Sequence, residues 1–249
     1  MKLNVRNDSI ANNTNILDIE VPEELKKKLR SGLEYFDDAL GGQGFTPSAV
    51  TLFTGTPGAG KTTMMLELAD NLTKSGAVVL FNTAEESLHQ LRMTTQRLSL
   101  MSGFVAGQDS SISKILAHCD VIRALNPGKP FFLIVDSLQT LDDGYFDSGR
   151  ITSATAERAL QQITDYCKEN YTNAVVIGQV TKSGKMAGTQ KLKHMVDAMI
   201  TLDVERKDEQ LLGCRILEVE KNRFGGAGAI FFLALRQNGF TEVQRVCIS

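Results

Sequence analysis

Short apolar runs alternate with amphipathic segments through the middle of the chain. The apolar runs cover residues 48–54, 77–83, 131–135 and 174–180, and segments with helical periodicity cover residues 61–74, 87–98, 111–125 and 153–169. Near-continuous apolar runs are typical of strands buried on both faces of a parallel sheet, and these runs are too short to be buried helices. The alternation therefore predicts βαβ units.

The pattern changes after residue 194. Strand-like segments cover residues 198–204, 214–221 and 229–235, with turn signals at Lys207-Asp208-Glu209, Gly225-Gly226 and Asn238-Gly239. Such closely spaced strands and turns are typical of hairpins. The predicted fold class is α/β, with a mostly parallel central sheet flanked by helices and with antiparallel C-terminal strands.

Residues 1–21 show no sustained period. They are rich in Asn and Asp and carry a short apolar patch formed by Ile16, Leu17, Ile19 and Val21. We interpret them as an arm or linker whose apolar patch could dock on a neighbouring subunit, and a disordered terminus is an equal alternative on composition. Pro22 opens a helical pattern that continues to Leu40 and stops at Gly41-Gly42, so we expect one domain over residues 22–249.

The composition limits the class of protein. The chain has 249 residues, enough for one sizeable core, and a formal net charge of -2, so any polyanion site must be local. Its cysteines form no C-x-x-C pair, which favours free thiols in a reducing compartment over a zinc ribbon or disulfide framework. No apolar run approaches the roughly 18 residues of a membrane helix. We expect a soluble, cytoplasmic protein.

One motif dominates the candidate chemistry. The segment Gly55-Thr56-Pro57-Gly58-Ala59-Gly60-Lys61-Thr62 fits G-x-x-x-x-G-K-[ST] between a predicted strand and a predicted helix. Its backbone N–H groups and the helix N-terminus would bind phosphate oxygens, Lys61 would reach the terminal phosphates, and the Thr62 hydroxyl would hold Mg²⁺. A chance glycine-rich turn is the weaker alternative. We predict an ATP and Mg²⁺ site over this segment and the adjoining Thr63.

Polar residues end three of the predicted strands. Asp136 follows one apolar run, where it could bind magnesium beside the phosphate loop or merely cap the next turn; we favour the metal role. Two glutamates, Glu85 and Glu86, follow the apolar run that ends at Thr83. We assign Glu85 to polarising the attacking water, and Glu86 to a structural role as negative charge at the N-terminus of the helix that Ser87 begins. Gln179 lies in line with these strand ends, where its amide could touch the γ-phosphate.

Two groups of cations follow. The loop 181–193 contains no acidic residue and four lysines, Lys182, Lys185, Lys191 and Lys193. It suits a nucleic-acid backbone, although a solvated surface loop is equally compatible with the composition. Lys221 and Arg223 are one residue apart, so both point to one side and could reach a neighbour's γ-phosphate; a charged strand end is the alternative. The three histidines show no metal-ligand spacing.

Taken together, these motifs resemble the bacterial RadA (Sms) branch of the RecA-like ATPases over about residues 28–247. The resemblance is carried by the phosphate loop and by the stretches 33–42, 82–87, 134–140, 180–184, 194–197 and 221–225, of which His-Met-Val-Asp and Lys-Asn-Arg-Phe-Gly are the most specific. It implies a DNA-dependent ATP hydrolase in homologous recombination and DNA repair, which binds single-stranded DNA and drives branch migration or helicase-like translocation as a hexameric ring or filament.

The resemblance also implies roles for single residues. Lys61 and Thr62 would carry nucleotide and Mg²⁺, Asp136 would be the Walker B acid, and Glu85 would be the catalytic base. Lys221 and Arg223 would be the family-specific cations, and the loop from Lys182 to Lys193 would contact DNA.

Three features depart from the RadA pattern. The four-cysteine zinc ribbon and the Lon-protease-like domain are missing from this sequence, and Gln179 stands where the family typically has His. The other presumptive DNA loop, residues 141–152, carries Asp142, Asp143 and Asp147 against Arg150 and would repel phosphate. We therefore expect a minimal, ATPase-core form from a bacterial cell or a phage-infected bacterium. The alternatives are a KaiC-like regulatory ATPase and an ATP-dependent scaffold that recruits recombination or replication proteins.

Overall fold

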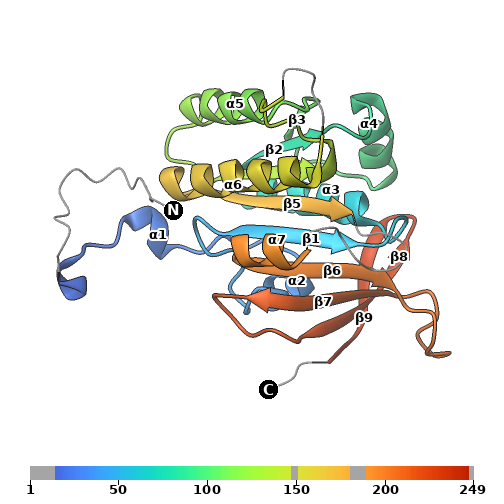
Figure 1. Cartoon of the computed structure of the whole chain (residues 1–249). Coiled ribbons are helices and arrows are strands. Elements are labelled where there is room, and N and C mark those ends of the chain that lie inside the picture. The colour runs from blue at the N-terminus through green and yellow to red at the C-terminus, as the bar shows by residue number, and fades with distance from the viewer. Residues whose placement is uncertain (1–14, 147–150, 180–188, 247–249) are drawn as a thin grey trace.

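The structure, a computed structural model, describes residues 15–146, 151–179 and 189–246. Within these residues one nine-stranded sheet runs in the order β3-β2-β4-β5-β1-β6-β7-β8-β9 (Figure 1). The strands are β1 (Val50–Gly55), β2 (Val78–Thr83), β3 (Val105–Gly107), β4 (Phe131–Asp136), β5 (Asn173–Gln179), β6 (Ala198–Val204), β7 (Arg215–Asn222), β8 (Ile230–Arg236) and β9 (Gly239–Val246).

The pairing confirms the predicted fold class. All neighbours from β3 to β6 are parallel, whereas β6, β7, β8 and β9 pair antiparallel. Every residue of β1 and β4 is buried, as the continuous apolar runs predicted. The strands formed by these runs therefore occupy the middle of the sheet.

Helices cover both faces of the sheet (Figure 1). One hydrophobic cluster packs α2 (Glu34–Ala39), α3 (Lys61–Lys74) and α4 (Leu88–Arg97) against one face, and a second packs α5 (Ile112–Ala124), α6 (Ser153–Asn170) and α7 (Thr189–Met195) against the other. The bounds of α3 to α6 lie within two residues of the predicted segments. Ser87 begins α4 through a capping box with Gln90, so the sequence cue for that helix start is confirmed.

The helix predicted from Pro22 to Leu40 is broken. It forms two short helices, α1 (Glu23–Lys26) and α2, and Leu29 between them makes an antiparallel bridge with Phe45. Gly32 has a φ of +77°, which a continuing helix cannot accommodate. The backbone N–H of Ser31 donates to the carboxylate of Asp37 at 2.8 Å, which fixes the turn that leads into α2.

Three elements were missing from the prediction: β3, β9 and α7. β3 is a short edge strand with two exposed residues, and β9 is exposed over much of its length, so neither carries a strong apolar signal. α7 lies in the segment that we predicted as a basic loop. Short 3₁₀ helices at Ile16–Asp18 (η1) and Leu138–Thr140 (η2) complete the described elements.

The described part of the N-terminal arm, residues 15–21, lies at the opposite end of the molecule from α4 (Figure 1). The side chains of Ile16, Leu17 and Val21 are 74%, 87% and 53% exposed. The apolar patch predicted from the sequence is therefore open to solvent in a single subunit. Of the helices within the described ranges, none combines the length and the apolar character that a membrane span requires.

Candidate nucleotide site

The phosphate loop joins the end of β1 to the start of α3. Gly55, Gly58 and Gly60 have φ values of +154°, +79° and +103°, which only glycine adopts without strain. A side chain at Gly58 would meet nothing within 4 Å, so the loop keeps an open face there. The Lys61 ammonium donates to the carbonyls of Gly55 at 2.8 Å and Thr56 at 3.1 Å, and burial lowers its pKa although nearby carboxylates oppose this.

Asp136 and Thr62 meet directly beside this loop. The Thr62 hydroxyl donates to Oδ2 of Asp136 at 2.8 Å, and Asp136 is 3% exposed. Burial raises the pKa of Asp136 to about 6, while the Thr62 hydrogen bond and Lys61 lower it and Glu85 and Glu86 raise it. A hydroxyl and a buried carboxylate are the hard oxygen ligands that Mg²⁺ prefers. The predicted metal pair therefore fits a magnesium ion.

The strand register brings the other predicted polar residues to the same edge of the sheet. Thr83 at the end of β2 pairs with Asp136, and Gln179 at the end of β5 pairs with Gly55. The hydroxyl of Thr83 accepts the backbone N–H groups of Glu85 at 3.2 Å and Glu86 at 3.1 Å. The turn after β2 is thereby fixed with Glu85 facing the neighbouring strand ends.

Glu85 and Gln179 are in contact. The Gln179 amide donates to both carboxylate oxygens of Glu85 at 2.8 Å, and the Ser137 hydroxyl donates to the same carboxylate. The backbone N–H of Gln179 donates to the side-chain oxygen of Gln139 at 3.1 Å. Sequence reasoning missed Ser137 and Gln139 as site residues, although both lie in the 134–140 stretch that carried the resemblance.

Lys221 and Arg223 lie together, but at the other end of the sheet from the phosphate loop. The Lys221 ammonium donates to the carbonyls of Lys193 at 2.6 Å and Val196 at 2.7 Å, and Arg223 donates to Asp197 at 3.1 Å. Lys221 pairs with Met199 near the start of β6, whereas the loop residue Gly55 pairs with Leu202. Three strand positions, at about 3.3 Å each, therefore separate Lys221 from its own phosphate loop along the sheet.

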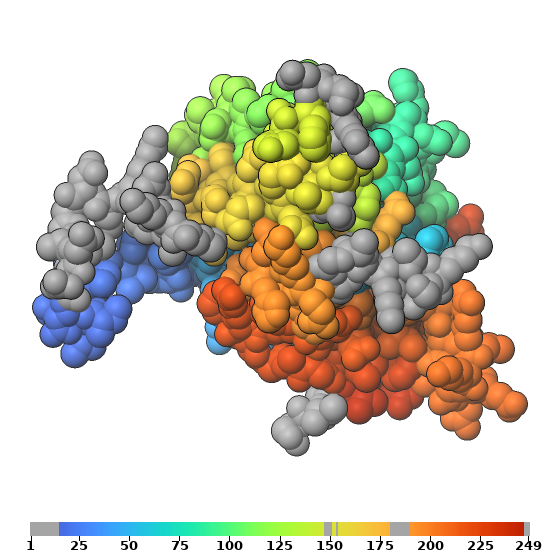
Figure 2. All heavy atoms as spheres, in the orientation of Figure 1, coloured from blue at the N-terminus to red at the C-terminus, as the bar shows by residue number. Residues whose placement is uncertain are grey.

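Of the four candidate DNA-binding lysines, Lys182 and Lys185 lie outside the described residues. Lys191 and Lys193 lie on α7, so the end of the predicted basic loop is helical. Lys191 forms an ion pair with Glu157 of α6, and Lys193 forms one with Glu220 of β7 at 3.1 Å. Figure 2 shows α7 at the surface between α6 and the C-terminal strands. The Lys191 side chain is 69% exposed and the Lys193 side chain 30%.

The acidic loop 141–152 is described in part. Asp143 forms an ion pair with Arg158 of α6, whose guanidinium lowers the pKa of that carboxyl. Arg158 also lies over the Tyr145 ring at 4.3 Å. Asp147 and Arg150 lie outside the described residues.

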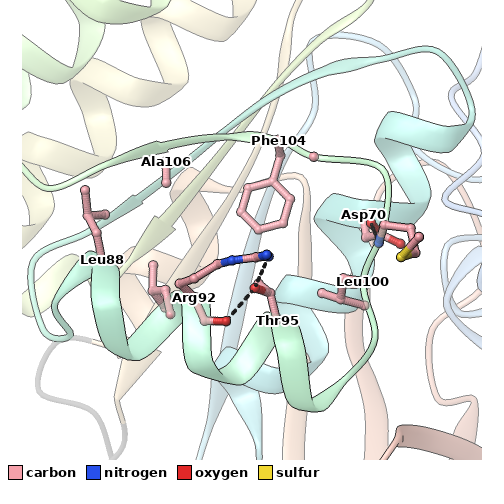
Figure 3. Close-up of a pocket in the computed structure, with 10 residues that line it drawn as sticks. Asp70, Leu88, Arg92, Thr95, Leu100, Phe104 and Ala106 are labelled. Atoms are coloured by element: carbon pink, nitrogen blue, oxygen red, sulfur yellow. Dashed lines mark hydrogen bonds between the residues drawn. The ribbon is translucent and has the colours of Figure 1, made fainter.

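A cavity of about 350 Å³ lies away from these residues, between α4 and the chain leading into β3. Figure 3 shows Leu88, Arg92 and Thr95 of α4 facing Phe104 and Ala106 across it, with Asp70 of α3 at one end. The Arg92 guanidinium donates to the Thr95 hydroxyl at 3.4 Å. None of the predicted site residues that the structure describes lines this cavity.

The chain is similar to known ATPases and DNA repair proteins. A family model described as "ATPase: KaiC" matches residues 29–101. The chain is 32% identical to DNA repair protein RadA of Aquifex aeolicus over 89% of this chain and 47% of that protein. It is 30% identical to DNA repair protein RadA of Streptococcus pneumoniae over 87% of this chain and 49% of that protein. The chain thus spans about half the length of the relatives it matches.

A solved structure of another ATPase domain shares the fold. It superposes with a TM-score of 0.71 at 16% identity, covering 89% of this chain and 93% of the other. The phosphate loop, its strand and helix, and the polar strand ends define a RecA-like P-loop ATPase. Within that class the chain is similar to the RadA proteins, at about 30% identity over most of its own length.

Proposed function

We propose that this chain is a DNA-dependent ATPase that acts in homologous recombination or DNA repair, binding single-stranded DNA and driving branch migration or helicase-like translocation as an oligomer. Two kinds of support carry the proposal. The relatives at about 30% identity are named DNA repair proteins, and Thr62, Asp136, Glu85 and Gln179 meet in two contacting pairs at one edge of the sheet. ATP is the substrate and Mg²⁺ is the cofactor.

In this proposal the phosphate loop binds ATP through its backbone N–H groups, and Lys61 exchanges its bonds to loop carbonyls for the terminal phosphates. Thr62 and Asp136 would hold Mg²⁺, which when bound neutralises phosphate charge and orients the β- and γ-phosphates. Glu85 lies beside this pair and orients the attacking water for in-line displacement. Each of these roles rests on a described contact or on the register of the sheet.

The contact between Glu85 and Gln179 is the observation that supports DNA control of hydrolysis. The catalytic carboxylate is held by the last residue of β5, and the segment 180–193 follows directly in the chain. A change in that segment on DNA binding would shift the Gln179 amide and so free or fix Glu85. The lysines of the segment, Lys182, Lys185, Lys191 and Lys193, would supply the attraction for the DNA backbone.

A second subunit would complete the site. Lys221 and Arg223 lie too far along the sheet to reach their own phosphate loop, yet both are held in one place by the segment 193–197. Head-to-tail packing would bring them to the γ-phosphate of a neighbour, where cations stabilise the developing charge. Such a heterologous interface closes into a ring or continues as a filament.

The subunit carries two surfaces suited to that packing. The exposed apolar patch of the arm lies at one end of the molecule, and the cavity beside α4 lies at the other (Figures 1 and 3). The patch alternates with Asp18 and Glu20, and the cavity offers Arg92 as a cation, while its acidic residue, Asp70, is already paired with Lys74 at 2.6 Å. We propose that residues 16–21 of one subunit occupy the cavity of the next, with residues 1–21 as the arm and 22–249 as the ATPase domain.

Steady-state ATP hydrolysis with and without single-stranded DNA tests the proposal. The wild type should be stimulated at least severalfold by DNA, and Lys61→Ala should lose turnover under both conditions because the phosphate contacts disappear. Turnover that depends on Lys61 but is indifferent to DNA would reject the DNA-dependent reading.

A KaiC-like regulatory ATPase is the second candidate, because the family model that matches residues 29–101 is described by that name. It would use the same site to regulate partner proteins without touching DNA. Replacing Lys182, Lys185, Lys191 and Lys193 with Gln separates the two functions. A DNA-dependent ATPase should lose DNA affinity and its salt dependence together, whereas a regulatory ATPase should show weak DNA binding before and after the change.

A further inference from the structure

The antiparallel strands β6 to β9 do more than extend the sheet, because each part of them reaches the phosphate loop. The first contact comes from β6. The carboxylate of Asp203 accepts the backbone N–H of Thr56 at 3.0 Å. One residue earlier, Gly55 lies so close to β6 that a side chain there would come within 2.0 Å of the Leu202 carbonyl. The start of the loop is therefore fixed against β6.

The second contact comes from Arg215, the first residue of β7. Its Nε donates to the carbonyl of Ala59 at 3.2 Å, and its Nη1 donates to the carbonyl of Gly213 at 2.7 Å. In a trans peptide the N–H points away from the preceding carbonyl. Because the Ala59 carbonyl faces Arg215, the N–H of Gly60 points away from β7. Arg215 thereby fixes the direction of a loop N–H group.

The third contact comes from the β8–β9 hairpin. A Cβ atom at Gly60 would lie 2.9 Å from the Phe240 ring and 3.0 Å from Leu235. The side chains of Phe240 and Leu235 therefore pack directly against the loop at Gly60. The hairpin is itself tied to the helices behind the loop. Glu67 of α3 accepts the backbone N–H of Phe240 at 3.2 Å, and Arg97 of α4 donates to the Gln237 carbonyl at 2.7 Å.

We infer that the C-terminal strands form a clasp, made of Asp203, Arg215, Leu235 and Phe240, that holds the phosphate loop in its nucleotide-binding shape, with Arg215 as a positioning residue. The inference rests only on nucleotide binding by the loop and not on DNA dependence. Arg215 acts through the loop backbone. Its loss should therefore weaken every ligand whose β-phosphate occupies the loop, whether or not a γ-phosphate is present.

Equilibrium binding of ADP and of a non-hydrolysable ATP analogue tests the clasp. Arg215→Ala should weaken both ligands by a similar factor, about tenfold, since a charge-assisted hydrogen bond that orders the loop is lost. Arg215→Gln keeps a side-chain N–H donor without charge and should restore binding to within about threefold of the wild type. Arg236→Ala removes an exposed arginine of β8 and should bind as the wild type does.

The opposite pattern would overturn the inference. If Arg215→Lys binds as the wild type while Arg215→Gln binds as weakly as Arg215→Ala, the charge acts on phosphate directly and the clasp is wrong. Unchanged ADP affinity in Arg215→Ala would reject it as well. Should Arg215→Ala fail to fold, Asp203→Ala provides the same comparison at Thr56, because it removes the oxygen that accepts the Thr56 N–H. Because no DNA is present, failure here is distinct from failure of the proposed DNA dependence.

Discussion

The side-chain amide of Gln179 donates to both carboxylate oxygens of Glu85, at 2.8 Å each. One residue of this pair ends β5, and the other follows β2, two strands away in the sheet. The pair thus links the carboxylate proposed to orient water with the segment proposed to bind DNA. An amide can hold a carboxylate without neutralising its charge, so the contact can position Glu85 and still leave it able to polarise water.

Replacing Gln179 with Ala should separate ATP hydrolysis from DNA control. The variant keeps the phosphate loop, Asp136 and Glu85, so basal turnover should stay within about tenfold of the wild type, while stimulation by single-stranded DNA should be lost. Turnover with and without DNA measures both quantities. Glu85→Gln is the matched control, since it should lower turnover by about 10² to 10⁴-fold under both conditions. Full DNA stimulation in Gln179→Ala would show that the signal takes another route.

Asp136 makes nucleotide binding sensitive to acid. Burial raises the pKa of this carboxyl to about 6, and only its ionised form binds Mg²⁺. At a fixed, subsaturating Mg²⁺ concentration, the Mg²⁺-dependent part of ATP-analogue binding should therefore weaken as the pH falls through about 6. Saturating Mg²⁺ should move the midpoint to lower pH, because the ion favours the ionised form. In Asp136→Asn the Mg²⁺-dependent part of ATP-analogue binding should be small at every pH. If that part of the binding does not change with pH in the wild type, the account is contradicted.

Glu67 should make the stability of the fold depend on pH. Burial raises its pKa from 4.5 to about 7, against the lowering effect of the Phe240 N–H and of Arg97. Between these two values the unfolded chain is ionised and the folded chain is protonated, so wild-type stability falls as the pH rises from about 4.5 to 7 and then levels off. Glu67→Gln removes this titration. The Tm of the wild type should therefore fall relative to that of the variant across this window.

Glu169 provides the control for that measurement. It is an exposed glutamate of α6, so Glu169→Gln makes the same Glu-to-Gln change in a side chain that is open to solvent, and its Tm is measured over the same pH range. Parallel profiles for wild type and Glu67→Gln would mean that Glu67 stays ionised in the folded protein.

The sequence predicted the centre of the sheet and the place of the phosphate loop between a strand and a helix, and particular residues show why. The run from Phe131 to Val135 is apolar at every position because both faces of the sheet are covered at this strand. A short run of this kind is typical of a buried strand and not of a helix. The loop from Gly55 to Thr62 must keep its glycines and its lysine to bind phosphate. Asp136 then followed from its place at a strand end beside the loop.

The parts that sequence reasoning missed depend on contacts between distant segments. Gly32 and the Ser31–Asp37 hydrogen bond interrupt the predicted N-terminal helix, because Leu29 pairs with Phe45 instead. The hydrogen bond from Gln179 to Glu85 joins residues that are 94 positions apart in the chain. Arg215 reaches Ala59 across 156 positions, and no local pattern around either residue indicates the contact.

If ATP bound by one subunit is hydrolysed with the cations of the next, as proposed above, mixing two inactive variants tests the shared site most directly. Lys61→Ala lacks a working phosphate loop and Arg223→Ala lacks a cation, so each should hydrolyse ATP poorly alone in the presence of single-stranded DNA. In an equimolar, randomly assembled mixture, about a quarter of the interfaces join an intact loop to an intact Arg223. We predict recovery towards about a quarter of wild-type turnover. A mixture no more active than the average of the two variants would contradict a shared site.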